Sequence, residues 1–225
     1  MTRSGPSVSS SSIGGSQPWN EAGNAAGFVL RYLPSMREQL VQWLGSEPLA
    51  DESLRRLIAH LVAQGFGEHG KGRIRDFLMR GIRSAARSTV SDVPEPKRPV
   101  IDFTKWTPDA PAWIATWRKG LLNRVWRELE RREHRDPSQC HYTALKFATE
   151  HPQEDAKMLA VRINSELKQK IEPKSIPAML VAGRALFAQL LEHEITETLD
   201  RGGDEAVLEE ATVLGLAGIF ASAKQ

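Results

Sequence analysis

The sequence predicts an all-α fold of two small helical domains joined by a proline-rich linker. Nearly every periodic segment places its apolar side chains three or four residues apart, and we find no convincing alternation of the kind that marks a strand. Apolar residues make up 40% of the 225 residues, which is enough to bury a core. A proline-rich stretch at residues 91–99 separates two groups of helical segments.

Shifts in composition divide the chain into five segments. Residues 1–26 are rich in Ser and Gly and are expected to form a disordered tail. Residues 27–90 are expected to form the first helical domain, residues 91–104 the linker, and residues 105–200 the second helical domain. Residues 201–225 form a C-terminal segment with acidic and apolar side chains.

The first domain is predicted to contain three helices. The first covers about residues 28–44 and ends at a proline-containing break, residues 45–50. Asp51 is the expected N-cap of the second helix, which ends at Gly65. The third helix, within residues 70–89, is rich in arginine.

Positive charge is most concentrated in this third helix, where six basic side chains stand against one acidic side chain. Wound at about 100° per residue, the segment places apolar and cationic side chains on opposite faces. The apolar stripe comprises Ile74, Phe77, Leu78, Gly81, Ile82 and Ala85. The cationic side comprises Arg73, Arg80, Arg83 and Arg87. Such a row of guanidinium groups is typical of a contact with nucleic acid, and the alternative is a solvated basic face that binds nothing.

The second domain is predicted to begin with a long amphipathic helix and to continue with three more. The expected helices are residues 111–134, 141–150, 154–168 and 174–199. A short turn at residues 169–173 joins the last two, and Ser175 is the candidate N-cap of the final helix. Two helices joined in this way match a helix-turn-helix layout.

The charges are segregated along the chain, although the net charge is only +2. Residues 118–135 hold seven basic and three acidic side chains, whereas residues 192–210 hold eight acidic side chains and a single arginine. This pattern indicates either a polyanionic partner or an acidic tail that folds back over the basic surface. Residues 205–220 carry the apolar side chains of a short amphipathic helix.

Several functional classes are not indicated. No apolar run approaches the roughly 18 residues of a membrane span, and the first 26 residues lack the apolar block of a secretory signal. We therefore expect a cytoplasmic protein without a membrane partner. The six histidines and Cys140, the one cysteine, show no zinc-ligand spacing, and no catalytic triad order stands out. We expect neither an enzyme nor a bound metal or cofactor.

Six stretches of this helical pattern resemble one protein family. They are Arg31–Pro34, Asp51–Leu54, Lys71–Leu78, Trp117–Arg127, His151–Asp155 and Phe187–Leu191. Together they are similar to bacterial RNA polymerase sigma factors of the small extracytoplasmic-function type, in a divergent version, over about residues 28–199. The resemblance implies a region-two-like unit of three helices and a region-four-like helix-turn-helix unit. It also implies a transcription initiation protein that binds the RNA polymerase core and promoter DNA.

The resemblance also implies which residues make these contacts. Phosphates near the −10 promoter element would meet Lys71, Arg73, Arg75, Arg80, Arg83 and Arg87. The DNA contacts of the second unit would be Lys174, Ser175 and Arg184. The polymerase-facing helix would carry Asp51, Glu52, Leu54, Leu57, Ile58 and Leu61.

Two departures from the family pattern keep other functions open. The expected recognition helix is apolar from Ile176 to Ala182, although base reading in the major groove needs Arg, Lys, Asn or Gln there. The polymerase-facing helix starts with only two acidic residues. The alternative is a degenerate sigma-like fold that acts as a protein-interaction adaptor or regulator, with an inhibitory or adaptor protein as its partner. A third hypothesis is a DNA-binding regulator that does not use polymerase.

Overall fold

The computed structural model describes Trp19, residues 25–67 and residues 71–222. In these residues the chain forms helices and connecting segments. Their single pairing of the β type is an isolated bridge between Arg73 and Leu199. The all-α prediction is confirmed. None of the helices in these ranges combines the length and the apolar character that crossing a membrane requires.

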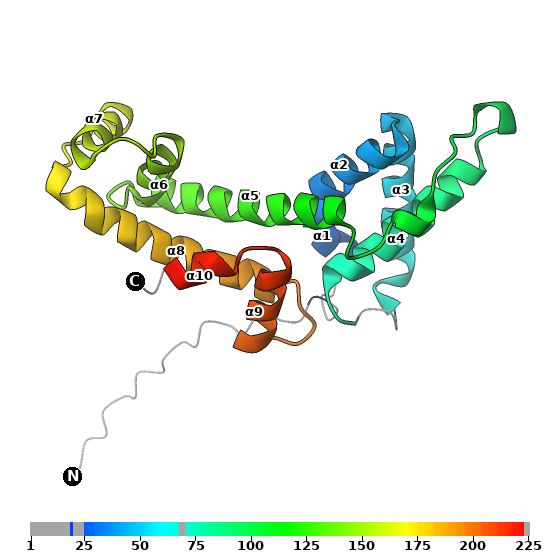
Figure 1. Ribbon diagram of the computed structural model, residues 1–225. Coiled ribbons are helices and arrows are strands. Elements are labelled where there is room, and N and C mark those ends of the chain that lie inside the picture. The colour runs from blue at the N-terminus through cyan, green and yellow to red at the C-terminus, as the bar shows by residue number, and fades with distance from the viewer. Residues whose placement is uncertain (1–18, 20–24, 68–70, 223–225) are drawn as a thin grey trace, which may run out of the picture.

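The helices are named in chain order (Figure 1). The first half contains α1 (Ala25–Val29), η2 (Leu30–Tyr32), α2 (Leu33–Leu44), α3 (Glu47–Gln64), α4 (Ile74–Ser91), η4 (Glu95–Lys97) and η5 (Phe103–Lys105). The second half contains α5 (Pro111–Arg135), α6 (His141–Glu150), α7 (Ala156–Leu167), η6 (Pro173–Ser175), α8 (Ile176–Thr196), α9 (Asp204–Val213) and α10 (Ala217–Ser222). The elements labelled η are short 3-10 helices.

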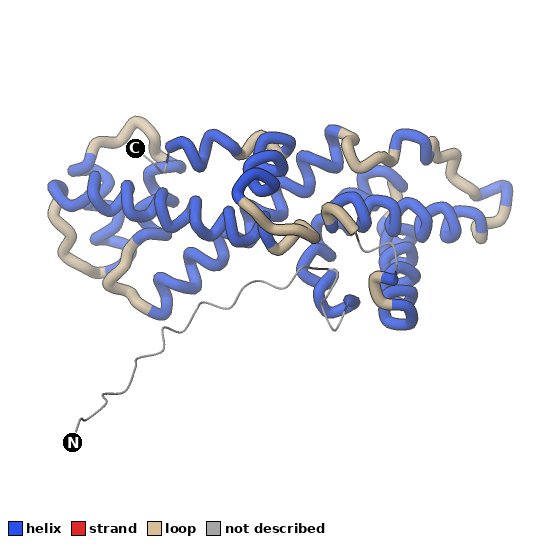
Figure 2. The backbone as a smooth tube through the Cα atoms, turned by 90° about the horizontal axis from the view of Figure 1, so that it is seen from below, coloured by secondary structure: helices blue, strands red, loops and turns tan. Residues whose placement is uncertain are grey.

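The long helix α5 organises an elongated molecule (Figure 1 and Figure 2). With 25 residues it spans about 37 Å. Helices α1–α4 gather at its N-terminal end, whereas α6 and α7 lie at its C-terminal end. Helix α8 runs beside α5, and α9 and α10 pack against α8. The last two helices therefore return toward the middle of the molecule.

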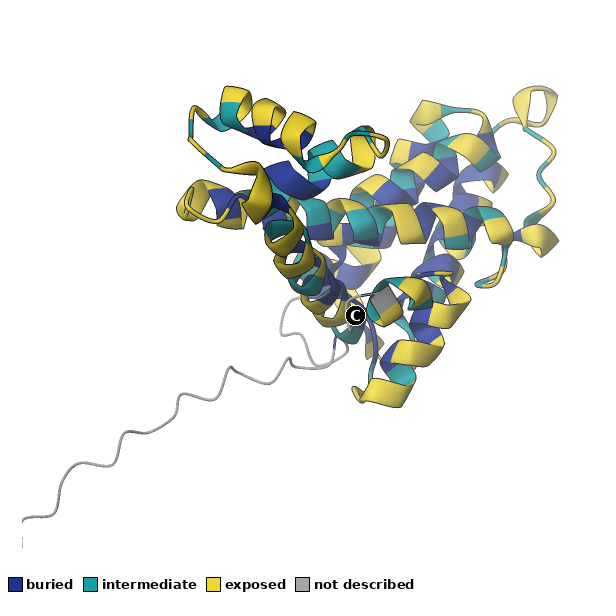
Figure 3. Cartoon of the chain, turned by 60° about the vertical axis from the view of Figure 1, so that its left-hand side comes forward, coloured by how far each residue is buried: buried dark blue, intermediate teal, exposed yellow. Residues whose placement is uncertain are grey.

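One hydrophobic core extends through both groups of helices, and buried residues continue between them (Figure 3). The indole of Trp117 on α5 stacks on the ring of Tyr32, with the ring centroids 4.8 Å apart. Buried Gln39 on α2 shares a hydrogen bond of 2.9 Å with Thr116 on α5. Because α2 and α5 pack directly on each other, the two predicted domains are joined by one main core. A second, smaller cluster of buried residues lies among α6, α7 and the start of α8.

The expected linker, residues 91–104, is mostly exposed, and its partly buried Ile101 and Phe103 pack against the core. Just after it, the indole of Trp106 is buried, with its centroid 4.5 Å from that of Trp43 on α2. Arg98 donates hydrogen bonds to the carbonyl oxygens of Ser91 (2.9 Å) and Val93 (3.0 Å). This segment therefore folds back on itself and leads the chain onto the surface of α2 and α4.

Helix α3 begins at Glu47, earlier than the predicted start at Asp51. The Oγ atom of Ser46 accepts a hydrogen bond from the N–H of Leu49 (3.4 Å) and makes Ser46 the N-cap. Pro48 lies in the first turn, where the N–H groups have no acceptor within the helix, so a proline is tolerated there. The proline that predicted a break belongs to the start of the helix.

Most of the predicted tail, residues 1–26, lies outside the described residues, but Trp19 does not. Its side chain is fully buried and meets Phe66 edge-on, with the ring centroids 4.9 Å apart. Its indole N–H donates to the carbonyl oxygen of Gly72 (2.9 Å). The expectation of disorder is therefore wrong at this residue, because the indole buries a large apolar area and satisfies its one donor.

A buried polar contact joins η2, α5 and α8. The guanidinium of Arg124 lies 4.4 Å from the ring centroid of Tyr32, and its Nε atom donates to Oε2 of Glu194 on α8 (2.7 Å). The phenolic oxygen of Tyr32 has no hydrogen-bond partner among the described residues. Burial in this position raises the pKa of Tyr32 to about 12.

Replacing Tyr32 by Phe is expected to change stability only at alkaline pH. At neutral pH the loss should be small, because the phenolic oxygen makes no hydrogen bond within the described residues. The pKa of Tyr32 is about 12 in the folded state against 10.0 for a free tyrosine, so the unfolded chain loses this proton first. The stability of the wild-type protein should therefore fall, relative to the variant, as pH rises from 10 toward 12.

The size of this relative fall is about 2 to 3 kcal/mol, from the difference between the two pKa values. Urea unfolding of both proteins across this pH range measures it. The half-buried Tyr142 provides the control, and Tyr142→Phe should alter the pH dependence less. Parallel pH profiles for the wild-type protein and Tyr32→Phe would contradict the assignment.

Candidate functional site

Backbone hydrogen bonds join the start of the arginine-rich helix α4 to the loop between α8 and α9. Gly72 adopts a φ of +78°, a left-handed conformation that glycine reaches without strain. The N–H of Ile74 donates to the carbonyl oxygen of Thr198 (2.9 Å), and the N–H of Asp200 donates to the carbonyl oxygen of Gly72 (3.1 Å). The loop between α8 and α9 therefore fixes the point at which α4 begins.

The buried face of α4 differs in part from the predicted stripe. The predicted positions that are buried are Ile74, Leu78 and Ile82. The other three, Phe77, Gly81 and Ala85, are only partly buried, whereas Arg75 and Ala86 are buried. The buried face extends toward Arg75 because the segment before α5 and helix α9 cover that side.

Arg75 is fully buried, although the sequence predicted that it contacts DNA. Its Nε atom donates to Oε1 of Glu210 on α9 (3.1 Å), and Nη1 donates to the carbonyl oxygen of Pro108 (2.5 Å). Glu210 is fully buried as well. A buried arginine needs such a charged partner because the free guanidinium would lose its hydration without compensation. The predicted DNA contact of Arg75 is wrong, because no part of the side chain reaches solvent.

Arg73 is covered by the same C-terminal helix. Its Nη2 atom lies 2.8 Å from Oε1 of Glu209, and its Nε atom lies 2.9 Å from Oε2 of Glu210. Only 26% of the side chain of Arg73 is exposed. The acidic C-terminal segment therefore folds back over the N-terminal part of the basic helix.

Two further arginines of α4 contact the segment between α4 and α5. Nη1 of Arg83 donates to the carbonyl oxygen of Trp106 (3.1 Å), and Arg83 is half-buried. The guanidinium of Arg87 lies 5.4 Å from the ring centroid of Phe103, but Arg87 remains exposed. These contacts hold Arg83 and Arg87 on the protein surface without neutralising their charge.

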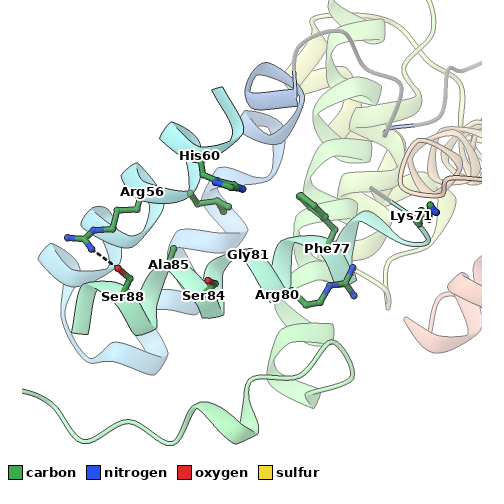
Figure 4. A pocket seen from close by; sticks show the side chains of 10 residues that line it. Arg56, His60, Lys71, Phe77, Arg80, Gly81, Ser84, Ala85 and Ser88 are labelled. Atoms are coloured by element: carbon green, nitrogen blue, oxygen red, sulfur yellow. Dashed lines mark hydrogen bonds between the residues drawn. The ribbon is translucent and has the colours of Figure 1, made fainter. Parts of the chain in front are cut away.

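Lys71 and Arg80 are exposed, and neither side chain forms an ion pair or hydrogen bond with another residue that the structure describes, although the charge of Arg80 acts on the carboxylate of Asp76. Both line a groove of about 820 Å³ between α3 and α4, the α3–α4 groove (Figure 4). Its apolar lining consists of Leu57, Phe77, Gly81 and Ala85. Its other polar lining consists of Arg56, His60, Ser84 and Ser88.

The α3–α4 groove carries positive charge. No carboxylate is among its lining residues in the described part of the chain. Arg56 donates to Oε1 of Glu52 (2.8 Å) and to Oγ of Ser88 (2.8 Å), and it pairs with Asp92 (2.7 Å). The hydrogen bond to Glu52 raises the pKa of Arg56, so this guanidinium stays charged. Since Arg56 is already paired, the cations available to a ligand are Lys71 and Arg80.

Helices α7 and α8, joined by a short connection, meet at a corner at the far end of α5. Asp155 caps α7 by accepting hydrogen bonds from the N–H groups of Lys157 and Met158 (both 2.9 Å). In the turn, the amide of Asn164 donates to the carbonyl oxygen of Ile171 (3.0 Å) and accepts from its N–H (2.6 Å). Helix α8 then starts at Ile176 after η6, so the turn is longer than predicted.

The DNA contacts predicted for this corner are exposed, but they do not form one cluster of free cations. Lys174 pairs with Glu172 (2.6 Å) in the turn. Ser175 occupies the N-cap position of α8, as predicted, but its side chain forms no capping hydrogen bond. Arg184 is exposed more than two turns into α8. Between Ser175 and Arg184 the exposed side chains are apolar, including Val181 at 56% exposure.

The residues predicted to face polymerase divide between the core and the surface. Leu54, Leu57 and Leu61 are buried in the core, so they support α3 from beneath. Ile58 is half-buried. Asp51 is exposed and pairs with Arg37 on α2 (2.7 Å), which lowers the pKa of Asp51. Glu52 is half-buried and pairs with Arg55 and Arg56.

Sequence reasoning missed several lining residues of the α3–α4 groove, among them Arg56 and His60, and it missed one buried partner of Arg75. Arg56 and His60 are four residues apart on α3, a spacing that puts them on one helix face, and this signal was available in the sequence. Glu210 belongs to the acidic residues 192–210, and the structure confirms the alternative that these residues fold back over the basic surface. Its specific pairing with Arg75, 135 positions away, could not be read from the sequence. The described residues contain no cluster of three or more His, Cys, Asp or Glu side chains that could hold a metal ion.

No protein-family model, no curated protein and no solved structure matches this chain.

Breaking the Arg75–Glu210 pair is expected to destabilise the protein strongly. Arg75→Met leaves the buried Glu210 carboxylate with fewer positive partners, and Glu210→Leu leaves the buried guanidinium without its main one. Each change should lower the free energy of unfolding by about 3 to 5 kcal/mol. Urea unfolding followed by circular dichroism measures this loss.

The double variant Arg75→Met/Glu210→Leu tests whether charge pairing is the cause. Its stability should lie much closer to that of the wild-type protein, because an apolar pair of similar volume has no charge to desolvate. A double variant as unstable as the sum of the two single variants would show that the two side chains act independently.

Proposed function

We propose that this chain is a sigma-factor-like transcription initiation protein that binds the RNA polymerase core and promoter DNA. The observation that supports the proposal is that α2–α4 and the corner of α7 and α8 lie at opposite ends of α5. At one end, α2–α4 present the α3–α4 groove with the free cations Lys71 and Arg80. At the other end, α7 and α8 serve in this proposal as the helix-turn-helix unit. A protein that contacts two separated promoter elements needs two such units.

In this proposal the DNA contacts of the first unit are fewer than the sequence suggested. Lys71 and Arg80 contact phosphates, and the exposed Arg87 extends the same side of α4. Arg73 and Arg75 take no part while α9 covers them. Contacts to phosphates position a protein on DNA but carry no sequence information by themselves.

The proposed polymerase contact lies on the outer side of α2 and α3. A shallow groove of about 590 Å³ there is lined by Leu33, Ile58 and the Arg37–Asp51 pair, among other residues. The proposal assigns no catalytic residue and no cofactor to the chain.

The exposed start of α8 supports a second candidate function. Pro177, Ala178, Val181 and Ala182 are exposed there, and none of these side chains can read a base edge by hydrogen bonding. Such a surface suits contact with another protein better than sequence-specific contact with DNA. The second candidate is therefore a protein-interaction adaptor with a sigma-like fold.

Arg80→Gln is expected to weaken binding to duplex DNA without unfolding the protein. Arg80 is exposed and pairs with no described residue, so its loss leaves no buried charge. If Arg80 contacts one phosphate, the slope of log affinity against log salt should become shallower by about 0.9. Fluorescence anisotropy of a labelled duplex at several salt concentrations measures both the affinity and the slope.

Arg201→Gln is the matched control, because Arg201 is also an exposed arginine but lies in the loop between α8 and α9. It should leave both quantities nearly unchanged. Capture of purified RNA polymerase core by the wild-type protein is the second arm. If the wild-type protein captures polymerase and Arg80→Gln does not change the salt slope, the adaptor is favoured. If the wild-type protein binds neither DNA nor polymerase, both candidates are contradicted.

A further inference from the structure

The α3–α4 groove has an apolar lining that a contact with DNA phosphates does not require. Phe77, Gly81 and Ala85 follow one another at four-residue intervals on α4, so they form a row about 12 Å long. Leu57 of α3 faces this row, and a methyl group built on Gly81 would lie 2.9 Å from its Cδ1 atom. The two helices therefore approach closely at Gly81, and small side chains keep the space beside it open.

The charged groups are distributed unevenly along the α3–α4 groove. At one end, Arg56 donates to Oγ of Ser88 and links the two helices (Figure 4). Toward the other end lie Lys71 and Arg80, which pair with no described residue. His60 is exposed on α3, on the opposite wall from Phe77. The groove thus combines an apolar part with an end at which the two unpaired cations Lys71 and Arg80 lie.

We propose that the α3–α4 groove binds a single-chain amphiphile with an anionic headgroup, such as an alkyl phosphate. The hydrocarbon chain lies along Leu57, Gly81 and Ala85, and the headgroup meets Lys71 and Arg80. The volume of about 820 Å³ is within the usual range of small-molecule sites, which combine an apolar lining with a few convergent polar groups. A nucleic-acid backbone would use the cations but would leave the apolar lining exposed to water.

This inference does not depend on the proposed function, because the ligand is bound without polymerase or DNA. It adds a consequence if that function holds. Since the headgroup occupies Lys71 and Arg80, a bound amphiphile would compete with nucleic acid for the same two side chains.

Calorimetric titration of the full chain with octyl, decyl and dodecyl phosphate tests the proposal. All three are used below the concentrations at which they form micelles, and inorganic phosphate is titrated in parallel. If the hydrocarbon chain of the ligand is buried in the groove, each added methylene group should raise the affinity by about fourfold. Inorganic phosphate should bind far more weakly than any of the three.

Two kinds of variant locate the binding site. Ala85→Leu and Ser84→Leu fill the groove from α4. Each should reduce dodecyl phosphate binding by about tenfold or more, because the leucine side chain occupies space that the hydrocarbon chain would bury in the groove. Lys71→Gln and Arg80→Gln remove the charges of the headgroup site and should each cause a loss of about tenfold. Arg55→Gln, an exposed arginine of α3 that does not line the groove, is the matched control and should bind like the wild-type protein. Circular dichroism verifies that each variant is folded, and the two filling variants provide independent tests.

Vesicles that contain phosphatidic acid distinguish a free amphiphile from a membrane surface. Binding of dodecyl phosphate that falls in the groove variants and holds in Arg55→Gln supports the proposal. Affinity that does not depend on chain length, equal affinity in all folded variants, or binding to the vesicles without binding to free dodecyl phosphate would each overturn it.

Discussion

The buried ion pair between Arg75 and Glu210 is the constraint on which the rest of the arrangement depends. Desolvating two charges is costly, and their attraction offsets that cost only when the geometry is good and the remaining polar atoms are bonded. Here the guanidinium also donates to the carbonyl oxygen of Pro108, so one side chain joins α4, the segment before α5, and α9. Arg73 shares the same carboxylate and adds Glu209. These parts of the chain must come together before any of these charges is satisfied.

The same constraint sorts the cations of α4 by role. Those near the start of the helix hold the C-terminal segment in place, and those near its end hold the segment that leads to α5. Lys71 and Arg80 remain available on the side of the α3–α4 groove. Arginines on one helix are therefore not equivalent, because the neighbours on each side of the helix differ.

Periodicity was enough to predict the helices but not their neighbours. The prediction for residues 141–150 matches α6, and the one for 111–134 falls one residue short of the end of α5. Both helices follow from local spacing of apolar side chains. Arg75 could not be placed in this way, because a helical wheel contains no information about Glu210, which lies 135 residues away. The shared core was missed for a related reason: the prolines of the expected linker mark a change of direction, not a separation of two cores.

The distance in sequence between Arg75 and Glu210 has a consequence for biosynthesis. A ribosome makes α4 long before it makes α9. The emerging N-terminal half therefore contains Arg75 without its partner Glu210. Until the C-terminal helices are released, the side of α4 that α9 covers is open, so the guanidinium of Arg75 can stay hydrated. The burial of Arg75 against Glu210 therefore cannot be completed until α9 has been synthesised.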